Sequence, residues 1–426
     1  MPTETRTNRA CRLTGFLGLQ RGNLGVLAMV VLVGMGERMG ERYLPIYLLT
    51  LGGGVLVVGL LQAMDNLLSA LYVFPGGYLS DRIGTKRSLL IFNLIAMGGF
   101  AMVALVPSWP AVLLGAVLFI SWSALSLPAI LSLIYKILPR NKRTMGVSMH
   151  SLVRRIPMAI GPLLGGFFIA EWGEQDGVRL AFGMAFFLAL AGLILQQKTL
   201  EDDSPVSHSL AGPRAPGPEK NPLKLLKAMN PAMKGLLAAD ILVRFCEQIP
   251  YAFVVIWCMK TIAEPVSAVQ FGLLTAIEMA TAMLVYIPVA YLADRGAKKP
   301  FVVMTFSFFS LFPLTLLFSR SLEWLIAAFI LRGLKEFGEP TRKALIMDLA
   351  PDHNKAGMFG LYYLIRDVFA SLAALVGAFL WQISPQTNLV TASVFGICGT
   401  AGFAVFGRDL VLAGTEKVNP DEPSNR

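Results

Sequence analysis

Hydrophobic residues in this chain are gathered into twelve long runs separated by polar segments. The first six runs cover residues 24–49, 55–79, 88–106, 111–138, 145–170 and 180–195. The other six cover residues 235–259, 267–292, 300–318, 322–349, 358–383 and 389–406. Most runs reach the roughly 20 residues that a helix needs to cross the hydrocarbon core of a bilayer. Only helices and closed barrels satisfy every backbone group in lipid, and such continuous runs exclude alternating barrel strands. The pattern predicts an all-α polytopic membrane protein with twelve transmembrane helices.

The longest polar segment inside the chain, residues 196–234, separates the sixth run from the seventh. It contains the stretch SPVSHSLAGPRAPGPEKNP, which is rich in Pro, Gly and Ser. Such a composition is typical of a linker. We therefore expect an N-terminal six-helix bundle over residues 1–195, a cytoplasmic linker over 196–234, and a C-terminal six-helix bundle with a short cytoplasmic tail over 235–426.

Composition agrees with a membrane protein and excludes an ordinary soluble enzyme. The 426 residues are 55% hydrophobic and 15% charged, against about 45–50% and about 25% in soluble domains. The four cysteines have no CxxC spacing, so neither a zinc site nor a disulfide framework is expected. The sequence also lacks a Walker loop, a Ser/His/Asp set, an HExxH motif and a heme or flavin motif. We expect neither an enzyme nor a cofactor-dependent protein.

Basic residues are unevenly distributed between alternate loops, and they account for the net charge of +10. They gather before the first run, after the second and between the fourth and fifth: Arg6, Arg9, Arg12, Arg21; Arg82, Lys86, Arg87; Lys136, Arg140, Lys142, Arg143. The alternate loops, such as 106–109 and 382–388, are poor in Lys and Arg. The positive-inside rule then places both termini in the cytoplasm (N-in/C-in). This bias explains the charge without a nucleic-acid partner.

An internal repeat relates the two halves of the chain. Residues 59–82 align without gaps on residues 272–295, with ten identities in 24 positions. The alignment pairs Asp65 with Glu278, Asp81 with Asp294 and Arg82 with Arg295; a second pairing relates Pro128 to Pro340 and Arg154 to Arg366. Parallel repeats imply a pseudo-twofold axis along the membrane normal and a transport path between the halves. This geometry favours transport by alternating access.

The segment GGYLSDRIGTKR at residues 76–87 resembles the signature loop of the major facilitator superfamily of secondary transporters. The segment YLADRGAKK at 291–299 resembles the second copy of that loop. GPLLGG at 161–166 resembles the end of a motif of proton-driven antiporters, although Ser148 and Pro157 replace its earlier glycines. The resemblance implies the major facilitator fold and a cavity lined by the first, fourth, seventh and tenth helices.

The repeated acid-base pair suggests gating residues. Asp81 can accept hydrogen bonds from the amino end of a neighbouring helix and can pair with a basic residue, which would latch one conformation. Asp81, Arg82, Asp294 and Arg295 are the predicted gating residues. The alternative is a loop that only sets membrane topology.

Ionisable side chains inside a membrane are costly unless they are paired or face water, so they are candidate site residues. Asp65 and Glu278 lie about a dozen residues into their runs, near the midplane. With Glu37 and Glu41 they are the candidates for proton or ion coupling. The candidate substrate-cavity residues are Arg38, Arg154, Arg244, Glu247, Arg332, Glu336, Glu339 and Arg366. One alternative is a set of structural ion pairs, in which Asp65 or Glu278 satisfies Arg154 or Arg366.

A cavity with carboxylates and arginines suits a small charged or chelated solute, with protons as the coupling ion. Segments 36–49 and 332–348 also resemble major facilitator proteins of magnetosome membranes, which are linked to iron supply. The resemblance implies transport of iron or an iron chelate across a bacterial inner membrane or a magnetosome membrane. Two alternatives stay open: a proton-coupled exporter of a metabolite or drug, and a non-transporting membrane scaffold or sensor.

Overall fold

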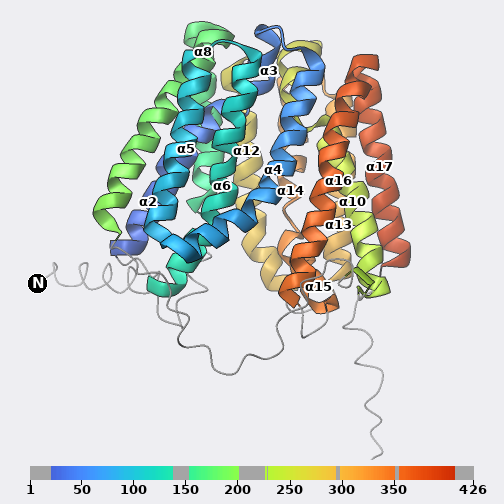
Figure 1. Cartoon of the computed structure of the whole chain (residues 1–426). Helices are drawn as coiled ribbons and strands as arrows, with labels where there is room; N and C mark the ends of the chain where they lie inside the picture. Colours follow the sequence, from blue (N-terminus) through green and yellow to red (C-terminus); the bar gives the residue numbers. More distant parts are fainter. Residues whose placement is uncertain are drawn as a thin grey trace, which may run out of the picture.

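The computed structural model describes residues 21–137, 153–200, 226–227, 229–293, 298–350 and 355–407 (Figure 1). Within these ranges the regular secondary structure is entirely helical. The helices of the first half of the chain are α2 (Arg21–Glu41), α3 (Leu44–Thr50), α4 (Gly54–Ile83), α5 (Thr85–Leu105), α6 (Trp109–Ile137) and α8 (Arg155–Thr199).

The second half follows the same plan with more breaks. Its helices are α10 (Pro231–Tyr251), α11 (Val254–Ile256), the π-helix η3 (Trp257–Thr261), α12 (Ala268–Ala293), α13 (Lys299–Phe318), α14 (Leu322–Leu334), α15 (Glu339–Leu349), α16 (Lys355–Ile383) and α17 (Pro385–Phe406). α10 and the segment after it form one span that is bent by 44°.

The described helices group into twelve rods, so the prediction of twelve transmembrane helices is confirmed. α8 counts twice, because Gly173 interrupts its 45 residues with φ 79° and ψ 173°. The pairs α2 with α3 and α14 with α15 each form one rod, and so does α10 with α11 and η3. Among the described residues, seven helices are long and apolar enough to span a membrane, or eight if the bent α10 rod counts as one span.

Two of the breaks fall at charged segments that precede a proline. α15 begins after the turn at Lys335–Gly338, and Pro340 lies in its first turn, where the missing N–H costs nothing. Pro45 has the same position in α3. Pro128, the repeat partner of Pro340, lies within unbroken α6, and its side chain is outside the described residues.

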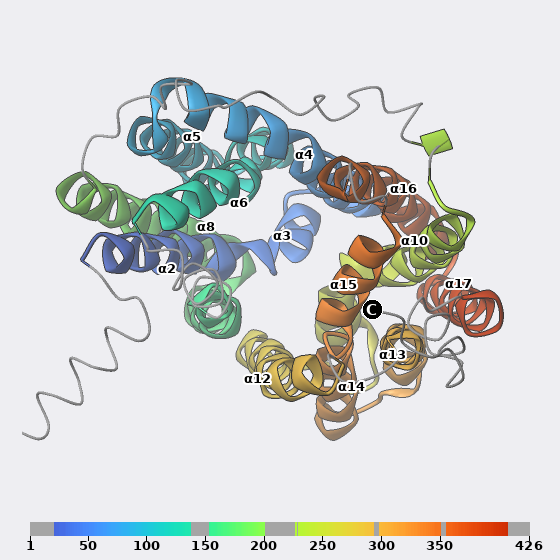
Figure 2. The ribbon, with the colours of Figure 1, turned by 90° about the horizontal axis from the view of Figure 1, so that it is seen from below.

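The two halves form two groups of helices, which Figure 2 shows side by side. They meet along two long contacts, α4 with α16 and α8 with α12. In order of rods these contacts join the second to the eleventh and the fifth to the eighth, as a twofold axis between parallel repeats requires. The contacts are close because small residues line them. A Cβ at Gly59 would lie 2.4 Å from the Cβ of Ala378, and one at Gly272 would lie 2.6 Å from the Pro162 carbonyl oxygen.

The halves are closed against each other on one face, which lies at the top of Figure 1 and which we call the upper face; α3 lies near it, α16 ends at it and α17 begins at it. The Tyr43 hydroxyl lies 2.7 Å from the Pro162 carbonyl oxygen and 2.8 Å from the Ala268 carbonyl oxygen, so it links α8 to α12. Glu174 and Lys260 form an ion pair between the halves on the same face. α2 begins and α17 ends at the opposite, lower face.

Candidate functional site

A central cavity lies between the halves, below the contacts that close the upper face. It holds about 560 Å³ of space between atoms, including its open mouth. Residues of α2, α3, α4 and α6 supply the wall from the first half, and residues of α10, α11, α12 and α14 supply the wall from the second half. Its polar side chains are those of Glu41, Arg42, Gln62, Asp65, Tyr251 and Arg332. Because both halves contribute, a solute in this cavity contacts each of them.

Asp65 projects into the cavity from α4 without a cationic partner. Its carboxylate accepts hydrogen bonds from Gln62 and Ser69, each with a donor–acceptor distance of 3.4 Å. These distances exceed the usual range of about 2.7–3.2 Å for such bonds. Among the described residues, no Lys, Arg or His nitrogen lies within 4 Å of this carboxylate. Asp65 is therefore an acidic group whose hydrogen-bond partners are weak neutral donors and whose nearest attracting cation, Arg38, lies farther away.

Arg42 supplies the opposite charge from the break between α2 and α3. Its guanidinium carbon lies 5.3 Å from the centroid of the Tyr251 ring, on the other half of the molecule. The Arg332 guanidinium lies 5.5 Å from the same centroid. No carboxylate of the described part of the chain comes within 4 Å of Arg42. Tyr251 thus makes cation–π contacts with two cations that come from different halves.

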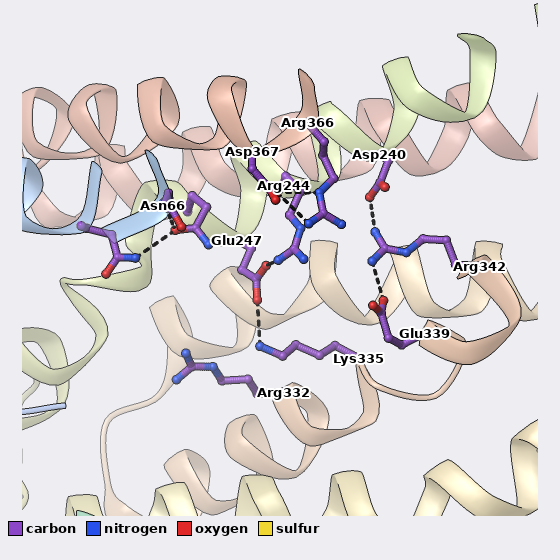
Figure 3. A network of polar contacts seen from close by, with 12 residues as sticks. Asn66, Asp240, Arg244, Glu247, Arg332, Lys335, Glu339, Arg342, Arg366 and Asp367 are labelled. Carbon is purple, nitrogen blue, oxygen red and sulfur yellow. Dashed lines mark hydrogen bonds and ion pairs between the residues drawn. The ribbon is translucent and has the colours of Figure 1, made fainter. Parts of the chain in front are cut away.

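Glu278, the repeat partner of Asp65, has a different environment. It is 1% exposed and pairs with Arg332 Nε at 3.3 Å and with Lys335 Nζ at 3.7 Å. Lys335 also donates to Glu247 at 2.8 Å, and Glu247 pairs with Arg244 (Figure 3). This network joins three cations to two carboxylates, so it carries an excess positive charge beside the cavity. The alternative in which Glu278 pairs with Arg366 is wrong for this structure.

A second ionic cluster lies among α10, α15 and α16, outside the lining of the central cavity (Figure 3). Arg342, 1% exposed, pairs with Asp240 and Glu339. Tyr362 donates to Asp240 at 3.0 Å. Arg366 pairs with its neighbour Asp367 at 2.7 Å. Glu339 and Arg366, which the sequence suggests as cavity residues, therefore belong to an ion-paired cluster that ties the second half together.

In the first half, Arg38 pairs with Glu41 at 2.6 Å and with Glu37 at 3.7 Å. Glu37, Arg38 and Arg154 line a smaller cavity beside Trp122. Arg155 pairs with Glu336 at 3.1 Å and so connects the halves below the central cavity. Of the eight residues predicted to line the substrate cavity, Arg332 is the one found in the lining of the central cavity.

Of the four predicted gating residues, the structure describes the side chain of Arg82. Arg82 lies in the last turn of α4, is exposed, and places Nη1 3.5 Å from the Tyr78 hydroxyl. The side chain of Asp81 and both Asp294 and Arg295 lie outside the described residues. Their gating role stays a prediction.

The sequence did not point to the neutral residues of the site. Tyr251 carries both cation–π contacts, and Gln248 accepts hydrogen bonds from Asn66 at 2.9 Å and Gln62 at 3.4 Å across the halves. Neither residue belongs to a motif. A signal for Gln248 was available, because an amide inside an apolar helix needs a polar partner.

The structure gives no indication of a bare metal site in its described part. Within those residues, no group of three or more His, Cys, Asp or Glu side chains is arranged to hold a metal ion. The charged groups of the central cavity are instead of both signs and come from both halves.

Comparisons with known proteins agree with this architecture. The family described as Major Facilitator Superfamily matches residues 26–265 and 236–425. An uncharacterized MFS-type transporter of Methanocaldococcus jannaschii is 21% identical over 378 residues, covering 85% of this chain and 89% of that protein. An uncharacterized MFS-type transporter of Mycobacterium tuberculosis is 29% identical over 181 residues, 42% of each chain.

Two solved structures share the fold at low identity. A variant of the nucleoside transporter NupG has a TM-score of 0.77 at 13% identity, with 90% of this chain and 100% of that chain covered. A peptide transporter POT in complex with sulfate has a TM-score of 0.72 at 15% identity, with 90% and 93% covered. With the family match over nearly the whole sequence, the chain belongs to the Major Facilitator Superfamily and is a multi-pass membrane transporter.

Proposed function

We propose that this transporter moves a small charged solute through the central cavity by alternating access and couples the movement to protons. The observation that carries the proposal is the pair of uncompensated opposite charges, Asp65 and Arg42, in one cavity that both halves line. A charged group inside a membrane is retained at a cost when it serves a solute or proton path. Asp65 is the proposed coupling residue, since its weak neutral partners allow it to exchange protonation states.

The proposal extends to the arrangement in the membrane. The upper face is the outer side, both termini are cytoplasmic, and the residues from 196 to 234 join the two bundles. Asp81 with Arg82 and Asp294 with Arg295 act at the cytoplasmic gate. The proposed location is a bacterial inner membrane, and the more specific proposal is a magnetosome membrane.

Iron is one solute within this class, and its chemical form matters. A carboxylate chelate such as ferric citrate presents anionic groups that Arg42 and Arg332 can bind, since guanidinium and carboxylate groups form strong bidentate hydrogen bonds. A bare ferrous ion would have to bind to oxygen ligands from Asp65 and its neutral neighbours alone. The chelate is therefore the form of iron that this proposal favours.

The test is uptake into proteoliposomes under an imposed proton gradient. Labelled ferrous ion, ferric citrate and a panel of small organic anions and zwitterions are compared for the wild type and Asp65→Asn. We expect gradient-dependent uptake of at least one solute and its loss in Asp65→Asn. The matched control is Glu323→Gln, which removes an exposed carboxylate at the upper face and leaves uptake unchanged.

Two results would contradict the proposal. Uptake that is equal with and without the gradient would exclude proton coupling. Folded protein that transports no solute of the panel, with Asp65→Asn indistinguishable from the wild type in every assay, would favour the scaffold or sensor. A gradient-driven efflux of a drug or metabolite from loaded vesicles would instead identify the exporter alternative.

A further inference from the structure

We propose that the central cavity binds a small zwitterionic solute, with its anionic group at Arg42 and its cationic group at Asp65. The inference rests on the proposed function and narrows its substrate class. It starts from the charges that the protein leaves uncompensated, because a ligand inside a low-dielectric site binds where the protein lacks a counter-charge.

The two charges are left open for a structural reason. In the second half, Glu278 is compensated by Arg332 and Lys335, which α14 and the turn after it supply. The repeat that pairs Pro128 with Pro340 places Ile120 and Ser123 at the positions of these two cations. α6 therefore supplies no cation to Asp65. Among the described residues, the asymmetry of the repeat leaves a carboxylate without a cation within 4 Å on the first half, whereas Glu278 on the second half has two such cations, although neither of its oxygens has a hydrogen-bond partner.

The anionic end of the solute is placed by cations that come from both halves. Arg42 and Arg332 lie within 5.3 and 5.5 Å of the centroid of the Tyr251 ring. Arg332 places Nε 3.3 Å from Glu278, and its guanidinium carbon lies 5.0 Å from the centroid of the Phe312 ring. Arg42 has no carboxylate within 4 Å among the described residues and is attracted to Glu278 and Glu41 only from farther away. A carboxylate at Arg42 with Arg332 beside it relieves the repulsion between the two cations and draws the halves together.

The cationic end of the solute is placed by Asp65 and its amide neighbours. Gln62 donates to Asp65 and to Gln248 at 3.4 Å in each case, so neither bond is short. An ammonium group brings charge-assisted hydrogen bonds of about 2.7–2.9 Å, which are stronger than these neutral bonds. When the ammonium group replaces Gln62 as the donor to Asp65, Gln62 keeps its hydrogen bond to Gln248 on the other half. The solute then contacts the first half through Asp65 and lies beside an amide pair that joins the two halves.

Single ions fit this arrangement less well than a zwitterion. An anion alone compensates Arg42 and leaves Asp65 charged and unpaired, and a cation alone leaves Arg42. A zwitterion compensates both at once and leaves the net charge of the cavity unchanged, which is the cheapest way to fill a site within a membrane.

The binding test uses the purified full-length protein in detergent at pH 7 and measures dissociation constants by calorimetry. The probes are four zwitterions of increasing charge separation, namely glycine, γ-aminobutyrate, 6-aminohexanoate and glycylglycine. Acetate, methylammonium and ferric citrate represent the single-charge and chelate alternatives. We expect at least one zwitterion to bind, and acetate and methylammonium to bind at least tenfold more weakly than that zwitterion.

Variants assign the two ends of the solute. Arg42→Gln and Asp65→Asn should each weaken zwitterion binding at least tenfold. Asp65→Asn should leave acetate binding unchanged, and Arg42→Gln should leave methylammonium binding unchanged. The controls Arg320→Gln and Glu323→Gln, both exposed at the upper face, should bind like the wild type. Unliganded melting temperatures within a few degrees of the wild type show that the variants are folded.

Three outcomes overturn the inference. The first is that none of the four zwitterions binds. The second is that acetate binds as tightly as any zwitterion. The third is that Asp65→Asn retains full zwitterion affinity. Gradient-driven uptake of ferric citrate without zwitterion binding would refute this inference and leave the proposed function intact, whereas zwitterion binding without any uptake would refute the proposed function.

Discussion

Alanine substitutions at two adjacent glycines of α8 should have different effects, because the two glycines face different partners. A Cβ at Gly166 would lie 2.4 Å from the carbonyl oxygen of Ala268, the first residue of α12 on the other half. A Cβ at Gly165 would lie 1.9 Å from the Met39 carbonyl oxygen, within the same half. Gly166→Ala should therefore disturb the contact between halves at the upper face, whereas Gly165→Ala should disturb the first half itself.

The size of the Gly166→Ala effect follows from the overlap. An ordinary contact of a Cβ begins at 3.4 Å, so α8 and α12 must separate by about 1 Å at this point. Overpacking of this kind costs about 1–3 kcal/mol. The part of this cost that comes from Ala268 applies only to the conformation that is closed at the upper face, since opening removes that contact. The Tyr43 hydroxyl, 2.9 Å from the added Cβ, belongs to the same half as Gly166. A bias of about 1–3 kcal/mol raises the ratio of molecules open at the upper face to molecules closed there about 5- to 150-fold.

The labelling rate of a buried cysteine measures this ratio. Val255, 3% exposed, lines the cavity from α11 and is changed to Cys in a background in which Cys11 and Cys398 are Ser. A membrane-impermeant maleimide applied to the upper side should react about 5- to 150-fold faster in the Gly166→Ala variant.

The control is Gly183→Ala in the same helix, where a Cβ meets no atom within 4 Å and the rate should not change. Gly165→Ala should instead lower the melting temperature. An unchanged labelling rate in Gly166→Ala, or an equal rise in Gly183→Ala, would refute the proposed role of this contact.

Loss of the buried Asp240–Arg342 pair should lower stability, whereas loss of the Glu174–Lys260 pair should change the rate of cysteine labelling. Asp240→Asn leaves the buried Arg342 with Glu339 as its remaining acidic partner and should cost about 3 kcal/mol of stability, seen as a lower melting temperature. An Asp348→Asn control, at an exposed pair, should cost less than about 1 kcal/mol. Lys260→Gln breaks the half-exposed pair with Glu174 and should speed maleimide labelling less than about fivefold; a larger rise would make this pair the main latch.

The sequence predicted the membrane helices well, since hydropathy alone determines which segments enter a bilayer. All twelve runs correspond to rods of the structure. The breaks within rods were not predicted, because a turn such as Lys335–Gly338 depends on the neighbours that donate hydrogen bonds to the freed carbonyl groups. Most charged residues of the site were predicted from the cost of burying them, but Arg42 was not among the predicted cavity residues.

Pairings within the site could not be predicted, because they join residues far apart in the chain. Asp65 and Glu278 are equivalent in the repeat, yet one lacks a cation and the other pairs with Arg332 and Lys335. The difference depends on Ile120 and Ser123, which occupy the positions of those cations in the first half. An aligned comparison of the fourth and tenth runs would have revealed it. Tyr251 gave no signal, because an aromatic residue in an apolar helix is usually packing.

Alternating access is the central claim, and the distances across both faces test it most directly. Spin labels at Thr50→Cys and Glu264→Cys report on the upper face, and labels at Arg87→Cys and Lys234→Cys report on the lower face; all four positions are exposed. Pulsed electron paramagnetic resonance measures the distribution of each label-to-label distance in the wild type and in Gly166→Ala. We predict a reciprocal change, in which the upper distance gains a longer population and the lower distance gains a shorter one. A longer upper distance with an unchanged or longer lower distance would contradict alternating access.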